Sequence, residues 1–186
     1  MKALDPRVSF AELQQWPDDP RDGRRYELYD GEVIVVPSPI ARHQRVALHV
    51  VEVLTDYERM SGGLVFGAPL DIVFSDYDVL QPDAVFFRQE RRHLINMMES
   101  GQVAPDLAVE VLSRSTGRRD RGRKADIFAR FGVVEYWIVD PIENTVEIYT
   151  NQGGFFAPAG VYDGRQEITS PTFPDLRFSA ARIFEE

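Results

Sequence analysis

The sequence predicts a mixed α/β protein with a central mixed β-sheet flanked by helices. Along the chain, a helix is followed by several strands, a second helix and further strands. Two of the strand-like runs, LAVEVL and YWIVD, are almost wholly apolar, as is typical of strands covered on both faces. The hydrophobic and charged fractions, 44% and 27% of 186 residues, are those of an ordinary globular protein. We therefore expect one domain around one core.

The N-terminal part contains a short helix, a hairpin and a long helix. SFAELQQWP has a helical pattern and is followed by a polar loop that ends near residue 24. In YELYDGEVIVVPSP, two strand-like runs meet at Asp30-Gly31, a favoured two-residue turn. We expect Ser38 to cap the next helix, with Pro39 in its first turn. The glycines at 62 and 63 should end that helix.

The rest of the chain consists mainly of strands. LVFG, LDIVF and PDAVFF are expected strands, followed by a helical stretch around 90–100. DLAVEVL leads through an arginine-rich loop to a helix over about 119–131, and VVEYWIVDP and TVEIYT are further strands. A glycine-rich hairpin, NQGGFFAPAGVYDG, precedes the last piece, LRFSAARIF. The expected domain, 1–186, thus has an N-terminal helix and hairpin (8–36), a core (38–150) and a C-terminal hairpin and tail (151–186).

Charge and composition limit the classes of protein. The net charge of −9 argues against a protein that coats DNA, whose surface is usually basic. A local basic patch can still act, because charges more than about 8 Å apart are largely screened. The chain has no cysteine, which excludes disulfides and thiolate zinc sites. Without a long apolar run or a signal-like start, we expect a cytoplasmic protein with no membrane partner.

Two acidic residues occur in runs that should be buried. Glu110 is in the middle of LAVEVL, and Asp83 follows Pro82 and begins AVFF. A buried carboxylate is costly unless a cation or a lysine compensates it. If strands 82–87 and 107–112 are neighbours, the two carboxylates lie roughly 5 Å apart on one face. Such hard oxygen ligands suit Mg²⁺ or Mn²⁺.

Lys124 is the third member of this candidate site. On a helix it shares a face with Ile127, Phe128 and Phe131, so its amine should be directed toward the sheet. Two acids, a metal and a lysine suit the hydrolysis of phosphodiester bonds. The metal lowers the pKa of a bound water, and the lysine orients that water and stabilises the transition state.

The segments YELYDGE, PDAVFF, PDLAVEVLS and GVVEYWIVDP, with the intervening lysine, resemble the Uma-type family of putative restriction endonucleases. This family belongs to the PD-(D/E)xK phosphodiesterase superfamily. The resemblance runs from about residue 10 to the C-terminus. It implies a restriction-endonuclease-like fold and a metal-dependent nuclease site of Asp83, Glu110 and Lys124. The superfamily pattern has its lysine two residues after the second acid, where this chain has Leu112, so Lys124 would replace it from the following helix.

The resemblance suggests further participants. A polar group from the first long helix often reaches the metal in the superfamily, which makes His43 a candidate base or helper. Glu27 is another candidate, because it alternates with the aromatic residues of YELY. A local basic patch is expected to contact the phosphates of DNA; its members are Arg114, Arg118, Arg119, Arg121 and Arg123.

Each candidate also has a structural interpretation. Asp83 fits a turn at the start of a strand, and Glu110 fits a salt-bridged position. Lys124 could extend its stem along apolar surface to reach water. For His43 we favour a hydrogen-bonded core histidine over a catalytic role.

Two functions remain open, and we favour the first. One is a Mg²⁺-dependent endonuclease that acts on DNA. The other is a non-catalytic module with the same fold that binds a partner or forms a homodimer, for which the apolar hairpin at Phe155-Phe156 is the candidate contact. A small-molecule enzyme is the weakest alternative, because neither a nucleophile elbow nor a phosphate-binding glycine loop occurs.

Overall fold

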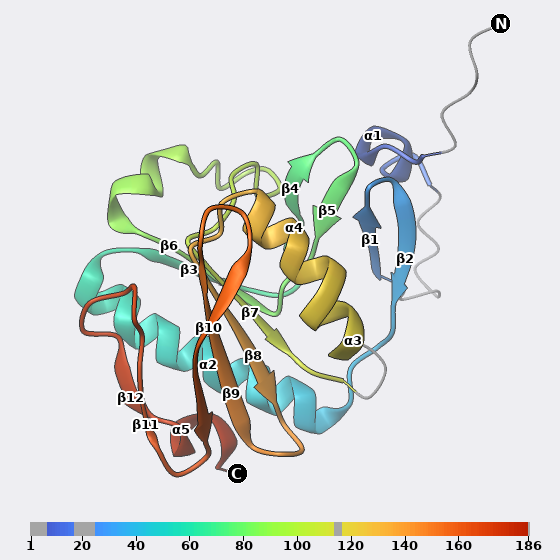
Figure 1. Ribbon diagram of the computed structural model, residues 1–186. Coiled ribbons are helices and arrows are strands. Elements are labelled where there is room, and N and C mark those ends of the chain that lie inside the picture. Colours follow the sequence, from blue (N-terminus) through green and yellow to red (C-terminus); the bar gives the residue numbers. More distant parts are fainter. Residues whose placement is uncertain (1–6, 17–24, 114–116, 186) are drawn as a thin grey trace, which may run out of the picture.

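A six-stranded mixed sheet forms the centre of the protein (Figure 1). The computed structural model describes residues 7–16, 25–113 and 117–185, without the side chain of residue 118. The sheet order is β10-β9-β8-β7-β6-β3. Only β7 and β8 are parallel, and the other neighbouring pairs are antiparallel. The strands are β3 (Leu64–Gly67), β6 (Ala84–Phe87), β7 (Leu107–Val111), β8 (Glu135–Asp140), β9 (Thr145–Asn151) and β10 (Phe156–Asp163).

Helices cover both faces of this sheet, so the expected mixed α/β fold is confirmed (Figure 1). Helix α2 (Ala41–Ser61) packs Val46 and Val50 into the same core cluster as Val109 of β7. Helix α4 (Ala125–Arg130) packs Phe128 into a second cluster with Ala108. Because side chains alternate along a strand, odd-numbered residues of β7 face α2 and even-numbered ones face α4. All five residues of β7 are therefore buried.

A smaller antiparallel sheet lies beside the large one. Its order is β2-β1-β5-β4. The β1–β2 turn has positive φ at Asp30 (51°) and Gly31 (76°), which confirms the predicted two-residue turn. The three-residue strand β5 was not predicted, because it is too short to show an alternating pattern. The strands are β1 (Arg25–Tyr29), β2 (Glu32–Val36), β4 (Ile72–Ser75) and β5 (Asp78–Leu80).

The start of α2 differs from the expectation. Helix α2 begins at Ala41 after Ile40, which makes no side-chain cap, so the predicted cap at Ser38 was wrong. Residues 37–40 stay outside the helix. The end of α2 is as expected, since Gly62 has the left-handed φ of 75°.

The helix predicted over 119–131 is interrupted. It comprises α3 (Gly117–Arg119), the segment η2 (Asp120–Lys124) and α4. Gly122 has non-helical dihedrals, φ −110° and ψ −109°. The chain therefore kinks just before Lys124 instead of running as one straight helix.

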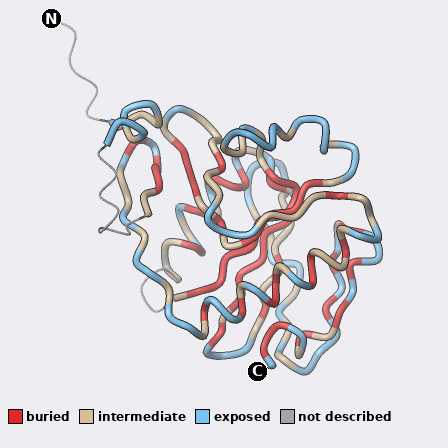
Figure 2. Tube along the Cα trace, turned by 180° about the vertical axis from the view of Figure 1, so that it is seen from behind, coloured by how far each residue is buried: buried red, intermediate tan, exposed pale blue. Residues whose placement is uncertain are grey.

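The remaining elements are short. Ser9 and Glu12 form a capping box at the start of α1. These elements are α1 (Phe10–Leu13), η1 (Gln89–Leu94), β11 (Glu167–Thr169), β12 (Arg177–Ser179) and α5 (Ala181–Phe184). Phe156 of the C-terminal hairpin stacks on Tyr136 at 5.4 Å, whereas Phe155 is exposed. Figure 2 shows the buried residues along the central strands. None of the helices in the described ranges is long and apolar enough to span a bilayer.

Candidate active site

Asp83 and Glu110 lie opposite each other at one end of the large sheet. Strands β6 and β7 are antiparallel neighbours, with Ala84 paired to Val109. Asp83 directly precedes Ala84 and Glu110 directly follows Val109, so the register places the two acids on one face. The expectation that these two strands are neighbours is thus confirmed.

Lys124 approaches this pair from the helical side. Its Nζ lies 2.6 Å from Glu110 Oε1 and 2.8 Å from Glu27 Oε1. The kink at Gly122 precedes Lys124, whose side chain is only 5% exposed. The lysine therefore sits between two buried carboxylates, on the α4 face of the sheet.

Glu27 is held by three hydrogen-bonding groups. Its Oε1 accepts a hydrogen bond of 2.8 Å from Gln81 N and contacts Lys124. The hydroxyl of Tyr29 donates to Oε2 at 2.9 Å. Burial raises the pKa of Tyr29 well above its usual value, so this hydroxyl stays protonated and remains a donor.

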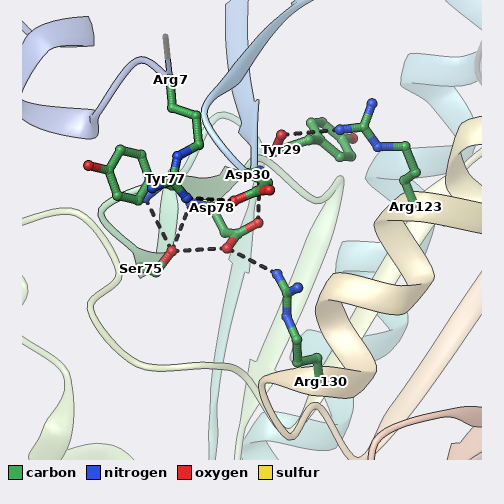
Figure 3. A network of polar contacts seen from close by, with 8 residues as sticks. All are labelled: Arg7, Tyr29, Asp30, Ser75, Tyr77, Asp78, Arg123 and Arg130. Atoms are coloured by element: carbon green, nitrogen blue, oxygen red, sulfur yellow. Dashed lines mark hydrogen bonds and ion pairs between the residues drawn. The ribbon is translucent and has the colours of Figure 1, made fainter. Parts of the chain in front are cut away.

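A second polar network anchors the hairpin that carries Glu27 (Figure 3). Buried Asp78 of β5 accepts a hydrogen bond from Asp30 N at 3.1 Å and one from Arg130 of α4 at 3.0 Å. Arg123 donates to Tyr29 O at 3.1 Å. Because Arg123 and Arg130 flank Lys124 in the chain, the same helical segment fixes both the hairpin and the lysine.

His43 joins the site from α2. Its Nε2 lies 3.3 Å from Asp83 Oδ2, and Val111 N donates to the same oxygen at 2.8 Å. Burial lowers the pKa of His43, but the interaction with Asp83 outweighs it and the net direction is upward. His43 is thus both a buried, hydrogen-bonding histidine and a neighbour of the proposed metal ligand.

The site carries more negative than positive charge. Burial raises the pKa of Glu110 well above its usual value; Lys124 opposes this, whereas Asp83, Asp120 and Glu27 add to it. Burial alone would lower the pKa of Lys124, but Glu110 and Glu27 hold it well above its usual value. The lysine is therefore a fixed cation among several acids.

One cavity of about 450 Å³ is lined by all five candidate residues: Glu27, His43, Asp83, Glu110 and Lys124. The cavity also reaches β1, the extended segment 37–40 and the turn after β8. Its other walls include Arg25, Ile40, Gln81, Arg119, Asp120 and Ile142. Arg25, Gln81 and Asp120 were not among the sequence-based candidates. Only Asp120 had a signal, as the single acid within the arginine-rich run.

The donor set fits a hard divalent cation. Within the described parts of the chain, no three acidic or histidine side chains form a complete set of metal ligands. Mg²⁺ does not need one, since it commonly binds through one or two carboxylates and retains several waters. Asp83 and Glu110 supply two carboxylates, and the unfavourable interaction between them is one that a cation would relieve.

The arginines of the expected basic patch are not all directed into the cavity. Arg119 lines it. Arg121 contacts Glu147 at 2.5 Å, and Arg123 contacts Glu32 at 2.6 Å. Arg114 lies outside the described residues, as does the side chain of Arg118.

The fold and this cluster define a class of protein in which an acid just before one central strand, an acid within the neighbouring strand and a lysine from a helical segment meet at the end of a mixed sheet. The chain belongs to the Uma2 family, described as "putative restriction endonuclease", whose model matches residues 10–181. Its fold is similar to a crystal structure of a putative nuclease belonging to DUF820 from Anabaena variabilis. The TM-score is 0.76 at 22% identity, covering 95% of this chain and 97% of the other. This likeness shows a shared fold. The comparison with curated proteins found no match.

Proposed function

We propose that the protein is a metal-dependent endonuclease that hydrolyses phosphodiester bonds in DNA. The observation that supports this best is the meeting of Asp83, Glu110 and Lys124 in one cavity, although they come from three elements. Lys124 already pairs with Glu27 and Glu110, so neutralisation of the lysine does not account for a third acid, Asp83, in the cavity. The family description agrees with this chemistry.

Asp83 and Glu110 would hold Mg²⁺ or Mn²⁺. When bound, the cation would lower the pKa of a coordinated water and offset charge on the phosphate. Lys124, whose raised pKa keeps it protonated, acts as a hydrogen-bond donor to the attacking water or to a phosphate oxygen and not as a base. Glu27 positions that amine, and His43 and Val111 N orient the Asp83 carboxylate.

The metal assignment is tested by calorimetric titration with Mn²⁺. Asp83→Ala should weaken binding at least about tenfold, because it removes one of two carboxylate ligands. Asp126→Ala is the matched control, since Asp126 is an exposed acid on α4. Binding that is the same in the wild type and in both variants would contradict the assignment of Asp83.

The reaction is tested by cleavage of plasmid and single-stranded DNA with Mg²⁺ or Mn²⁺. The wild type and Asp126→Ala should cut, whereas Lys124→Ala should lose activity by about a hundredfold or more, as expected for loss of a group that stabilises developing charge. Circular dichroism establishes that the variants are folded. A folded wild-type protein that cuts neither DNA would favour the non-catalytic, partner-binding alternative.

A further inference from the structure

A second cavity of about 510 Å³ adjoins the one described above. Four residues line both cavities: Arg25, Ser38, Pro39 and Asp83. The second cavity continues along α2 past Leu48 and Val51, and along the loop after β3. Asp83 therefore lies between two adjoining spaces, so a chain molecule could pass the proposed metal site and extend to both sides of it.

Exposed apolar side chains are found on both sides of Asp83. Ile40 and Ile142, 59% and 58% exposed, line the first cavity, and Leu48, 48% exposed, lines the second. Ligand cavities are lined largely by apolar side chains. Unpaired bases expose apolar faces that can pack against such side chains, whereas bases inside a duplex are stacked on one another and present only their edges.

Among the described residues, few cations line the two cavities. Proteins that grip duplex DNA neutralise several phosphates with lysine and arginine. Here Arg121 and Arg123 are already paired with glutamates. Among the described residues, the arginines that line the two cavities are Arg25 and Arg119. This number of cations suits the few phosphates of a short single strand.

The candidate active site also lies deep in the protein. The side chains of Asp83, Glu110 and Lys124 are only 11%, 6% and 5% exposed. Bending a duplex site of about 20–30 base pairs by 40–90° costs about 1–6 kcal/mol, so placing one of its phosphates in a recess has an energetic cost. A single strand has a flexible backbone and can place one phosphate there.

From these features we infer that the two cavities together bind single-stranded or locally unpaired DNA, and that this is the substrate class of the site. The inference rests on the nuclease function proposed above. The scissile phosphate lies beside Asp83 and Lys124, and the bases before and after it lie against Ile142 and Leu48. Arg25, which has no ion pair within the described part of the chain, contacts a phosphate between the two cavities.

Fluorescence anisotropy tests this inference with a labelled oligonucleotide, used single-stranded or annealed to its complement. Ca²⁺ replaces Mg²⁺, because it takes the same kind of oxygen ligands. The wild type should bind the single strand at least about tenfold more tightly than the duplex. Leu48→Glu should weaken binding to the single strand by about tenfold, because it replaces an apolar contact with a carboxylate that repels the phosphates. Met60→Glu, an equally apolar and more exposed position on the same helix, should change it less than about twofold.

A second assay separates the inference from the function on which it rests. Both oligonucleotide forms and a duplex with a single-stranded overhang are incubated with Mn²⁺. Cleavage confined to the unpaired regions supports the inference. Binding and cleavage of the duplex that equal those of the single strand overturn the inference and leave the nuclease function intact. Equal effects of Leu48→Glu and Met60→Glu also overturn it. No cleavage of any substrate by the folded wild type overturns the nuclease function itself.

Discussion

Replacing Lys124 with methionine should strongly destabilise the protein at neutral pH. The amine lies within 2.8 Å of both Glu27 and Glu110, and all three side chains are at most 6% exposed. Methionine keeps most of the apolar stem but removes the charge, which leaves two buried carboxylates without a cation. Removal of one partner from a buried ion pair costs about 3–5 kcal/mol. For a chain of this length, that corresponds to a Tm lower by about 6–20 °C.

The loss of stability caused by Lys124→Met should be larger at pH 8 than at pH 5. The pKa of Glu110 is higher in the folded than in the unfolded protein. As pH falls, Glu110 therefore becomes protonated in the folded protein at a higher pH than in the unfolded protein. The penalty for burying its carboxylate decreases as pH falls through the raised pKa. Lys124 opposes that rise, so its removal raises the pKa further and the cost of the substitution should be smaller at pH 5 than at pH 8. The raised pKa of Lys124 itself contributes fully below about 10.4, so it adds no pH dependence in this window.

Urea unfolding at pH 5 and pH 8, followed by tryptophan fluorescence, measures both effects. The double variant Lys124→Met/Glu110→Gln is the control, because it removes one of the two buried charges that Lys124→Met leaves uncompensated. It should be more stable than Lys124→Met alone. A loss of unfolding free energy below about 1 kcal/mol for Lys124→Met at pH 8, the range of an exposed pair, would refute the buried ion pair as a source of stability. A double variant that is no more stable than Lys124→Met would refute it as well.

Two further predictions concern the packing around the sheet. Buried Glu135 accepts hydrogen bonds from Trp137 Nε1 at 2.6 Å and Ser170 Oγ at 2.8 Å. Glu135→Ala should therefore lower the free energy of unfolding in urea by about 3 kcal/mol. A loss below about 1 kcal/mol would show that water replaces the acceptor. Gly63→Ala should lower the free energy of unfolding by about 1–3 kcal/mol, because the added Cβ would overlap both the ring of Phe86 and the backbone carbonyl oxygen of Phe87. An unchanged Tm would mean that both groups can move aside.

Much of the fold could be predicted because its main strands are locally distinctive. β7 and β8 are continuous apolar runs, and the Asp30-Gly31 turn has a residue pair suited to positive φ. Other features have no comparable local signal. β5 has three residues and owes its pairing to β1 and β4. The start of α2 and the kink at Gly122 do not follow from local propensity.

The candidate site was predictable in part for the same reason. Glu110 and Lys124 attract attention because each is a charged residue in an apolar pattern. Arg25 and Gln81 show no such contrast, since they lie at the edges of strands in ordinary polar surroundings. Their place at the cavity results from pairing between segments that are more than 50 residues apart, a contact that no short pattern encodes.

The sequence by itself determined that this protein has a buried mixed sheet and that two acids and one lysine lie within its apolar segments. The tertiary structure decided that these groups meet. It also decided that Glu27 holds the lysine, that His43 contacts Asp83 and that two arginines are paired with glutamates. The physical reason is that burial patterns arise from local periodicity, whereas convergence of side chains depends on strand register and helix placement across the whole chain.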